Sequence, residues 1–195
     1  MSSPWSFDPV RLARHERDAW AAYYLRDWRR VLTSAVGMVD EGFGMAWPST
    51  LRGAWLVLRA NQAWAPYPQN DPEAARRLME RFYRLVVRSH GLDLDANRAA
   101  ELEVDWWHEH RVLQREQTHG DESALVEALT RLYAYVYSRP RERMAEAARH
   151  RALAMRASDA WVAAGCRRED PRLGQVLADL ERSYASLLES VRVAA

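Results

Sequence analysis

Aspartate and proline stand next to each other at three widely separated points of the chain: Asp8-Pro9, Asp71-Pro72 and Asp170-Pro171. Proline suits the first turn of a helix, because its missing N–H has no intrahelical partner there and its φ is already helical. The preceding aspartate can accept hydrogen bonds from the free N–H groups of the same turn. Each pair therefore predicts the start of a helix, and Trp47-Pro48 and Arg139-Pro140 are weaker forms of the same signal.

Two more helix starts are predicted without proline, at Asp95 and in the region of Asp121. Glycine tolerates the left-handed conformation that ends many helices. The expected helix ends are therefore marked by Gly42 or Gly44, Gly91, Gly120 and Gly165. Together these signals predict seven helices, at about 9–41, 48–65, 72–90, 95–118, 121–138, 140–164 and 171–193. The long first helix is expected to kink near Gly37.

No segment alternates between apolar and polar residues with a period of two, so no β-strand is expected. The predicted fold class is all-α: one domain, residues 1–195, that forms a compact bundle of about seven helices. The segment Gly53–Leu58 is apolar on every side, which is typical of a helix surrounded by other helices. Helix 48–65 is therefore predicted to lie at the centre of the bundle. Its more polar second half should either emerge from the core or face a polar pocket.

Charge and cysteine content limit the partners and the compartment. All 28 basic residues are arginine, which is typical of a protein from a GC-rich bacterial genome, and 27 acidic residues leave a net charge of only +1. Such a balance gives no strong field for attracting phosphates, so no nucleic-acid partner is expected. No apolar run approaches about 18 residues, so no membrane partner is expected. A single cysteine excludes an internal disulfide, and the first residues lack a signal-peptide pattern, so we expect the cytoplasm.

Helix 95–118 carries the strongest candidate chemistry. At 3.6 residues per turn, Glu103, Trp107 and His110 share one stripe, so a carboxylate and an imidazole stand on either side of a large apolar ring. Glu16 interrupts an apolar stripe in the first helix in a similar way. Carboxylates and imidazoles at such positions can act as general acids and bases. Glu103, His110 and Glu16 are therefore the candidate catalytic residues.

The preferred hypothesis is a soluble protein that binds a small molecule in a polar pocket between helices, with the option of Glu/His acid–base catalysis. Arg59 and Arg111 would hold an anionic group, Asn61 and Gln62 would orient the ligand, and Trp107 would form a wall. The cofactor is unknown. In the structural alternative, the buried acids pair with arginines, for which Arg52, Arg59 and Arg111 are the candidates.

Two further hypotheses remain open. In the first, Glu16, Glu103, His110 and Asp159 lie on four helices and supply the oxygen and nitrogen ligands of a metal ion. In the second, the protein is a homodimeric interaction module whose exposed aromatic residues and terminal helix form the contact. Nine tryptophans and eight tyrosines supply the aromatic surface for such a contact, although core packing is the commoner use of these residues.

The chain also resembles an uncharacterised family of small helical proteins from GC-rich bacteria. This resemblance covers most of the chain. The segments that carry it are Arg52–Pro68, Asn70–Pro72, Leu102–Trp107, His110-Arg111 and Ser158–Cys166. It implies an all-helical fold and no particular activity, cofactor or partner.

Overall fold

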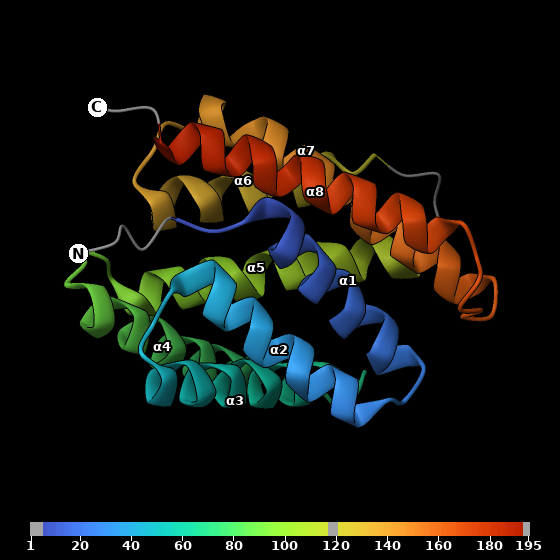
Figure 1. The fold of residues 1–195 in the computed structure, drawn as a ribbon, viewed down its shortest axis with the longest axis horizontal. Coiled ribbons are helices and arrows are strands. Elements are labelled where there is room, and N and C mark those ends of the chain that lie inside the picture. Colours follow the sequence, from blue (N-terminus) through green and yellow to red (C-terminus); the bar gives the residue numbers. More distant parts are fainter. Residues whose placement is uncertain (1–5, 117–120, 193–195) are drawn as a thin grey trace.

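The computed structural model describes residues 6–116 and 121–192, and within these ranges it contains helices and no strand (Figure 1). The helices are α1 (Pro9–Tyr24), α2 (Trp28–Phe43), α3 (Trp47–Trp64), α4 (Pro72–His90), α5 (Ala96–Glu116), α6 (Ser123–Tyr137), α7 (Arg141–Ala163) and α8 (Arg172–Arg192). The predicted all-α bundle is confirmed. No helix within these ranges is long and apolar enough to cross a membrane.

The predicted helix starts and ends are largely confirmed by their cap geometry. The Asp8 carboxylate accepts hydrogen bonds from the N–H groups of Val10 and Arg11 at 2.9 and 3.2 Å, and Asp71 caps α4 in the same way. Gly44 and Gly91 end α2 and α4 in the left-handed conformation. The predicted helix end at Gly120 lies outside the described residues. The same holds for the expected helix boundaries at 118 and 193.

The predicted long helix 9–41 is wrong, because the chain forms two helices there. The first ends at Tyr24, and Arg26 takes a left-handed φ of 58°. Asp27 then caps α2 by accepting a hydrogen bond from the N–H of Arg30 at 3.2 Å. Arginine rarely occupies the left-handed region, so the capping aspartate Asp27 is the local signal of the break in the sequence.

Gly37 does not kink a helix but allows two helices to approach. It lies within α2, and a Cβ atom at this position would stand 2.4 Å from the ring of His15 in α1. That distance is well inside van der Waals contact. Glycine is therefore the residue that lets the antiparallel pair α1 and α2 pack closely.

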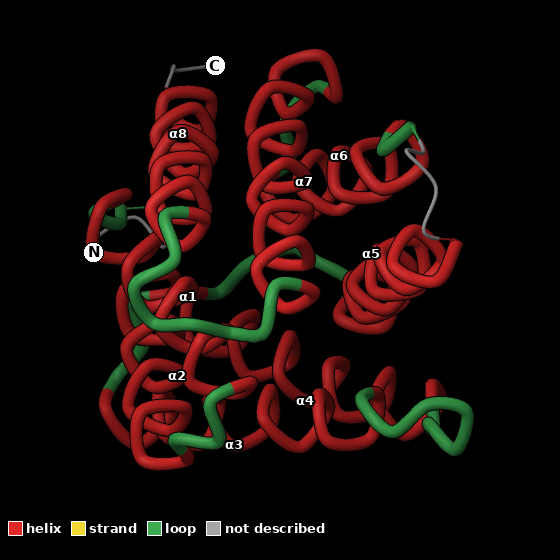
Figure 2. The backbone as a smooth tube through the Cα atoms, turned by 90° about the vertical axis from the view of Figure 1, so that its right-hand side faces the viewer, coloured by secondary structure: helices red, strands yellow, loops and turns green. Residues whose placement is uncertain are grey.

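The eight helices form a closed ring in space. Each helix packs against the next one in the chain, and α8 returns to pack against α1. In Figure 1, α6, α7 and α8 occupy one side, α2, α3 and α4 the other, and α1 and α5 lie between them. Figure 2 shows α7 and α8 side by side, viewed at a right angle to Figure 1. A ring of this kind encloses an interior that every helix can line.

Helix α3 is peripheral, not central as predicted. It packs against α2 and α4, and it exposes Trp47, Leu51 and Trp55, with Trp55 60% exposed. Within Gly53–Leu58, α3 is apolar on every side because the outward-facing Trp55 is apolar, as are the buried residues on the opposite side. Amphipathicity alone could not distinguish an apolar surface from a buried one.

Candidate ligand cavity

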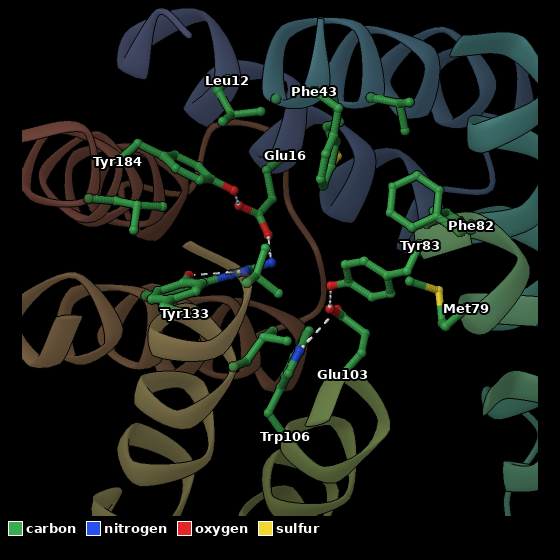
Figure 3. Close-up of a pocket in the computed structure, with 18 of the residues that line it drawn as sticks. Leu12, Glu16, Phe43, Met79, Phe82, Tyr83, Glu103, Trp106, Tyr133 and Tyr184 are labelled. Carbon is green, nitrogen blue, oxygen red and sulfur yellow. Dashed lines mark hydrogen bonds and ion pairs between the residues drawn. The ribbon is translucent and has the colours of Figure 1, made fainter. Parts of the chain in front are cut away.

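A cavity of about 210 Å³ lies inside the ring, and all eight helices contribute residues to its wall (Figure 3). Most of the wall is aliphatic or aromatic. Among the described residues, three charged side chains line it: Glu16 from α1, Glu103 from α5 and Arg151 from α7. Asn61 also lines the cavity and is exposed, so the cavity reaches the surface beside the second half of α3.

Glu16 is the centre of the first polar group in the wall. It is only 1% exposed, and its Oε1 accepts a hydrogen bond from Nη2 of Arg151 at 2.6 Å. Its other oxygen accepts a hydrogen bond from the hydroxyl of Tyr184. Nη1 of Arg151 in turn donates to the hydroxyl of Tyr133 at 3.0 Å. The buried ion pair thus joins α1 to α7, and its hydrogen bonds to Tyr133 and Tyr184 connect it to α6 and α8.

Glu103 is the centre of the second polar group. Its Oε2 accepts a hydrogen bond from the hydroxyl of Tyr83 at 2.6 Å, and its Oε1 accepts one from Nε1 of Trp106 at 3.0 Å. Both donors are neutral, and no salt bridge to Glu103 occurs within the described residues. The two carboxylates of the cavity therefore differ: Glu16 faces a guanidinium at hydrogen-bond distance, and Glu103 does not.

The electrostatics of the cavity follow from this difference. Burial raises the pKa of Glu103, and the hydrogen bond from Tyr83 and the charge of Arg151 offset only part of that effect. Burial also raises the pKa of Tyr83 well above its usual range, and the neighbouring Glu103 raises it further. Burial alone would lower the pKa of Arg151, but the charge of Glu16 and nearby tyrosines raise it well above normal. Arg151 therefore stays charged, whereas Glu103 is the carboxyl that burial favours in its protonated form.

The cavity brings together four of the residues singled out from the sequence: Glu16, Glu103, Asn61 and Trp107. His110 is not among them. Its ring contacts the carboxylate of Asp159 at 3.0 Å, two turns of α5 away from Glu103. The structure therefore does not bring Glu103 and His110 together at the cavity, because a stripe two turns long extends beyond it.

The remaining predicted binding residues lie elsewhere. Arg59 and Gln62 are exposed, and Arg59 lies over the ring of Trp55. Arg111 stacks on Trp64, with 4.6 Å between its guanidinium carbon and the ring centroid, and partial burial lowers its pKa. None of these three residues lines the cavity. Arg59 and Gln62 lie on the exposed side of α3, whereas Arg111 is half-buried near Tyr23 and Tyr24 of α1, outside the cavity wall.

The predicted set of metal ligands is also not assembled. Glu16 and Glu103 face the cavity, whereas His110 and Asp159 form a separate pair. Within the described ranges, no group of three or more His, Cys, Asp or Glu side chains is arranged to hold a metal ion. Glu16 already has Arg151 and Tyr184 as partners.

Sequence reasoning missed the partners of the two acids. Arg151 was not among the expected arginine partners, because its helix carries many arginines and its exposed face dominates the pattern. A signal was present, since Arg151 follows the buried Ala147 and Ala148 by one turn and precedes the buried Met155 by another. Tyr83, Tyr133 and Tyr184 occupy apolar stripes, and nothing in their spacing separates a hydrogen-bonding tyrosine from a core aromatic residue.

Comparison with family models, curated proteins and solved structures finds no match to this chain. The resemblance to a family from GC-rich bacteria therefore stays an expectation.

Proposed function

We propose that the protein binds a small, mainly apolar molecule that carries one polar group, inside the cavity of the helical ring. The observation that supports this proposal is a largely apolar cavity of about 210 Å³ with Glu103 and the Glu16–Arg151 pair in its wall. Ligand sites commonly combine apolar walls with a few convergent polar groups. An engineered cavity of roughly 150 Å³ binds benzene, so a molecule somewhat larger than benzene fits here.

Binding is better supported than Glu/His catalysis, because His110 lies outside the cavity wall. Any proton transfer to the bound molecule would depend on Glu103, whose carboxyl lines the cavity and whose pKa is raised by burial. We expect the cytoplasm as the compartment, on the evidence of the single cysteine.

The test is a calorimetric titration of the full chain with toluene, phenol, indole and benzyl alcohol, preceded by native mass spectrometry of the untagged protein. At least one probe should bind, or a retained molecule should appear in the mass spectrum.

Val57→Phe should weaken binding by about tenfold or more, because the larger ring occupies cavity space. Val126→Phe is the matched control: both valines are half-buried and packed against the core, but only Val57 lines the cavity. No retained molecule and no binding of any probe would contradict the proposal.

Self-association is the second candidate function, favoured by the apolar stripe that Trp47, Leu51 and Trp55 form on the outer face of α3. The terminal helix does not belong to this surface, because the apolar residues of α8 face the core. Sedimentation velocity at increasing concentration tests the idea. A dimer that Trp55→Arg converts to a monomer would support it, and a monomer at every concentration would exclude it.

A further inference from the structure

We propose that the polar group of the ligand is an organic ammonium, held by the Glu103 carboxylate and the aromatic rings beside it. This inference rests on the proposed binding function and specifies the class of ligand.

The first argument is the balance of charge. Within the part of the chain that the structure describes, Glu16, Glu103 and Arg151 are the only charged residues that line the cavity. Arg151 is engaged by Glu16 at 2.6 Å, so these two charges compensate each other. When Glu103 is ionised, its negative charge therefore has only neutral hydrogen-bond donors. A charge without a counter-ion in contact is costly in a largely apolar cavity, and a cationic group on the ligand would reduce that cost.

The second argument is the aromatic character of the wall around Glu103. Tyr83 and Trp106 donate to its carboxylate, and Trp107 and Trp20 line the same cavity. Aromatic faces attract ammonium groups, most strongly where water is excluded. One ring of the wall already accepts a cation, since the guanidinium carbon of Arg151 lies 5.1 Å from the centroid of a Trp106 ring. A carboxylate among such rings is a favourable environment for an amine.

Other polar groups fit less well. A carboxylate on the ligand would need Arg151, but two of its nitrogens already bind Glu16 and Tyr133, and its Nε is covered by protein. Such an anion would also be repelled by Glu103. A neutral hydroxyl could hydrogen-bond to Glu103 but would leave its charge uncompensated. The cavity therefore selects for a cation.

Binding of an ammonium should depend on pH, because it competes with a proton for Glu103. The titratable groups that face Glu103 are Tyr83 from α4, Tyr133 and Tyr137 from α6, and Arg151 from α7. Burial raises the pKa of all three tyrosines, so they stay neutral near neutral pH. Arg151 stays protonated and positively charged. None of these four groups therefore changes its protonation state near neutral pH. Amine affinity should therefore increase as the pH rises through the pKa of Glu103 and then level off.

The test uses three probes of nearly equal shape on the full chain: benzylamine, benzyl alcohol and benzoate. Isothermal titration calorimetry should show benzylamine binding at least about tenfold more tightly than benzyl alcohol, the effect of one charge-assisted hydrogen bond. Benzoate should be the weakest. Benzyl alcohol affinity should not change with pH in the way that benzylamine affinity does. These comparisons use the wild-type protein and do not depend on the folding of a variant.

Glu103→Gln should abolish the preference for benzylamine over benzyl alcohol, because the variant has no negative charge at this position. Glu101→Gln is the matched control on the same helix, because Glu101 pairs with Arg76 and Arg98 outside the cavity and should not change either affinity. If benzyl alcohol or benzoate binds as tightly as benzylamine, the ammonium assignment is overturned and the cavity remains a binding site. If none of the three probes binds, both proposals are overturned.

Discussion

Glu16 and Arg151 are 135 residues apart in the chain, and in the structure they form a buried ion pair with 2.6 Å between Oε1 and Nη2. This pair connects the first helix of the ring to the seventh. The side chains of Glu16 and Arg151 are 1% and 13% exposed, so water screens their attraction little. Hydrogen bonds to Tyr184 and Tyr133 complete the partners of the pair. The polar wall of the cavity is therefore also a structural junction of the ring.

Arg151→Met should destabilise the protein by about 3–5 kcal/mol, because it leaves the Glu16 charge buried without a counter-ion. Urea unfolding followed by circular dichroism measures this change. Adding Glu16→Gln to Arg151→Met should recover part of the loss, since the uncompensated charge is then gone. Arg149→Met, at an exposed position of the same helix, should change stability by less than about 0.5 kcal/mol. Equal losses for the two methionine variants would show that the ion pair contributes nothing.

Tyr184→Phe should cost about 1.5–3 kcal/mol, the usual contribution of a hydrogen bond to a charged group. The ring stays in place and only the hydroxyl that donates to Glu16 is lost. Tyr135→Phe is the control, at a half-buried tyrosine outside this network, and should be nearly neutral. The comparison of the two variants by thermal unfolding separates the hydrogen bond from the general effect of losing a hydroxyl. A neutral Tyr184→Phe variant would contradict the assigned role.

The sequence was most informative where a helix boundary depends on local chemistry. Asp8 and Asp71 cap the helices that they were expected to cap, because an aspartate and a proline act only on the next few N–H groups. The break at Arg26 could not be predicted in this way. It requires a left-handed arginine, which residue type does not indicate, and it lets α1 and α2 fold back and pack against each other.

The candidate site was predictable only in part, for a similar reason. Glu16 and Glu103 interrupt apolar stripes, and that local anomaly correctly placed both in the interior. Which arginine compensates which acid depends on the closure of the ring. The order of helices around that ring is not encoded in any single stripe. Arg151 was therefore missed, and Arg59 and Arg111, which were expected at the pocket, lie outside the cavity wall.

Gly37→Ala should destabilise the protein by about 1–3 kcal/mol, because the added methyl group would collide with the ring of His15. The collision involves the end of a side chain, so His15→Ala should relieve it. In a double-mutant cycle, Gly37→Ala should become neutral or stabilising in the His15→Ala background, since alanine favours a helix more than glycine does. Urea unfolding of the four proteins measures the coupling. An unchanged cost in both backgrounds would mean that His15 is not the group that Gly37 accommodates.

Glu103 should make the protein less stable as the pH rises. Its pKa in the folded state is raised by burial, whereas in the unfolded chain it lies at the ordinary value near 4.3. Between the two values the folded state binds more protons than the unfolded state, so the free energy of unfolding falls with rising pH and levels off above the folded-state pKa. Each unit of pKa difference corresponds to about 1.4 kcal/mol. The side chain that replaces Glu103 in Glu103→Gln cannot titrate. Urea unfolding over this pH range measures the stability of wild type and variant. The variant should gain stability relative to wild type as the pH rises. Glu101→Gln, outside the cavity, should show no such shift, and a pH-independent difference for Glu103→Gln would mean that burial does not hold the proton on Glu103.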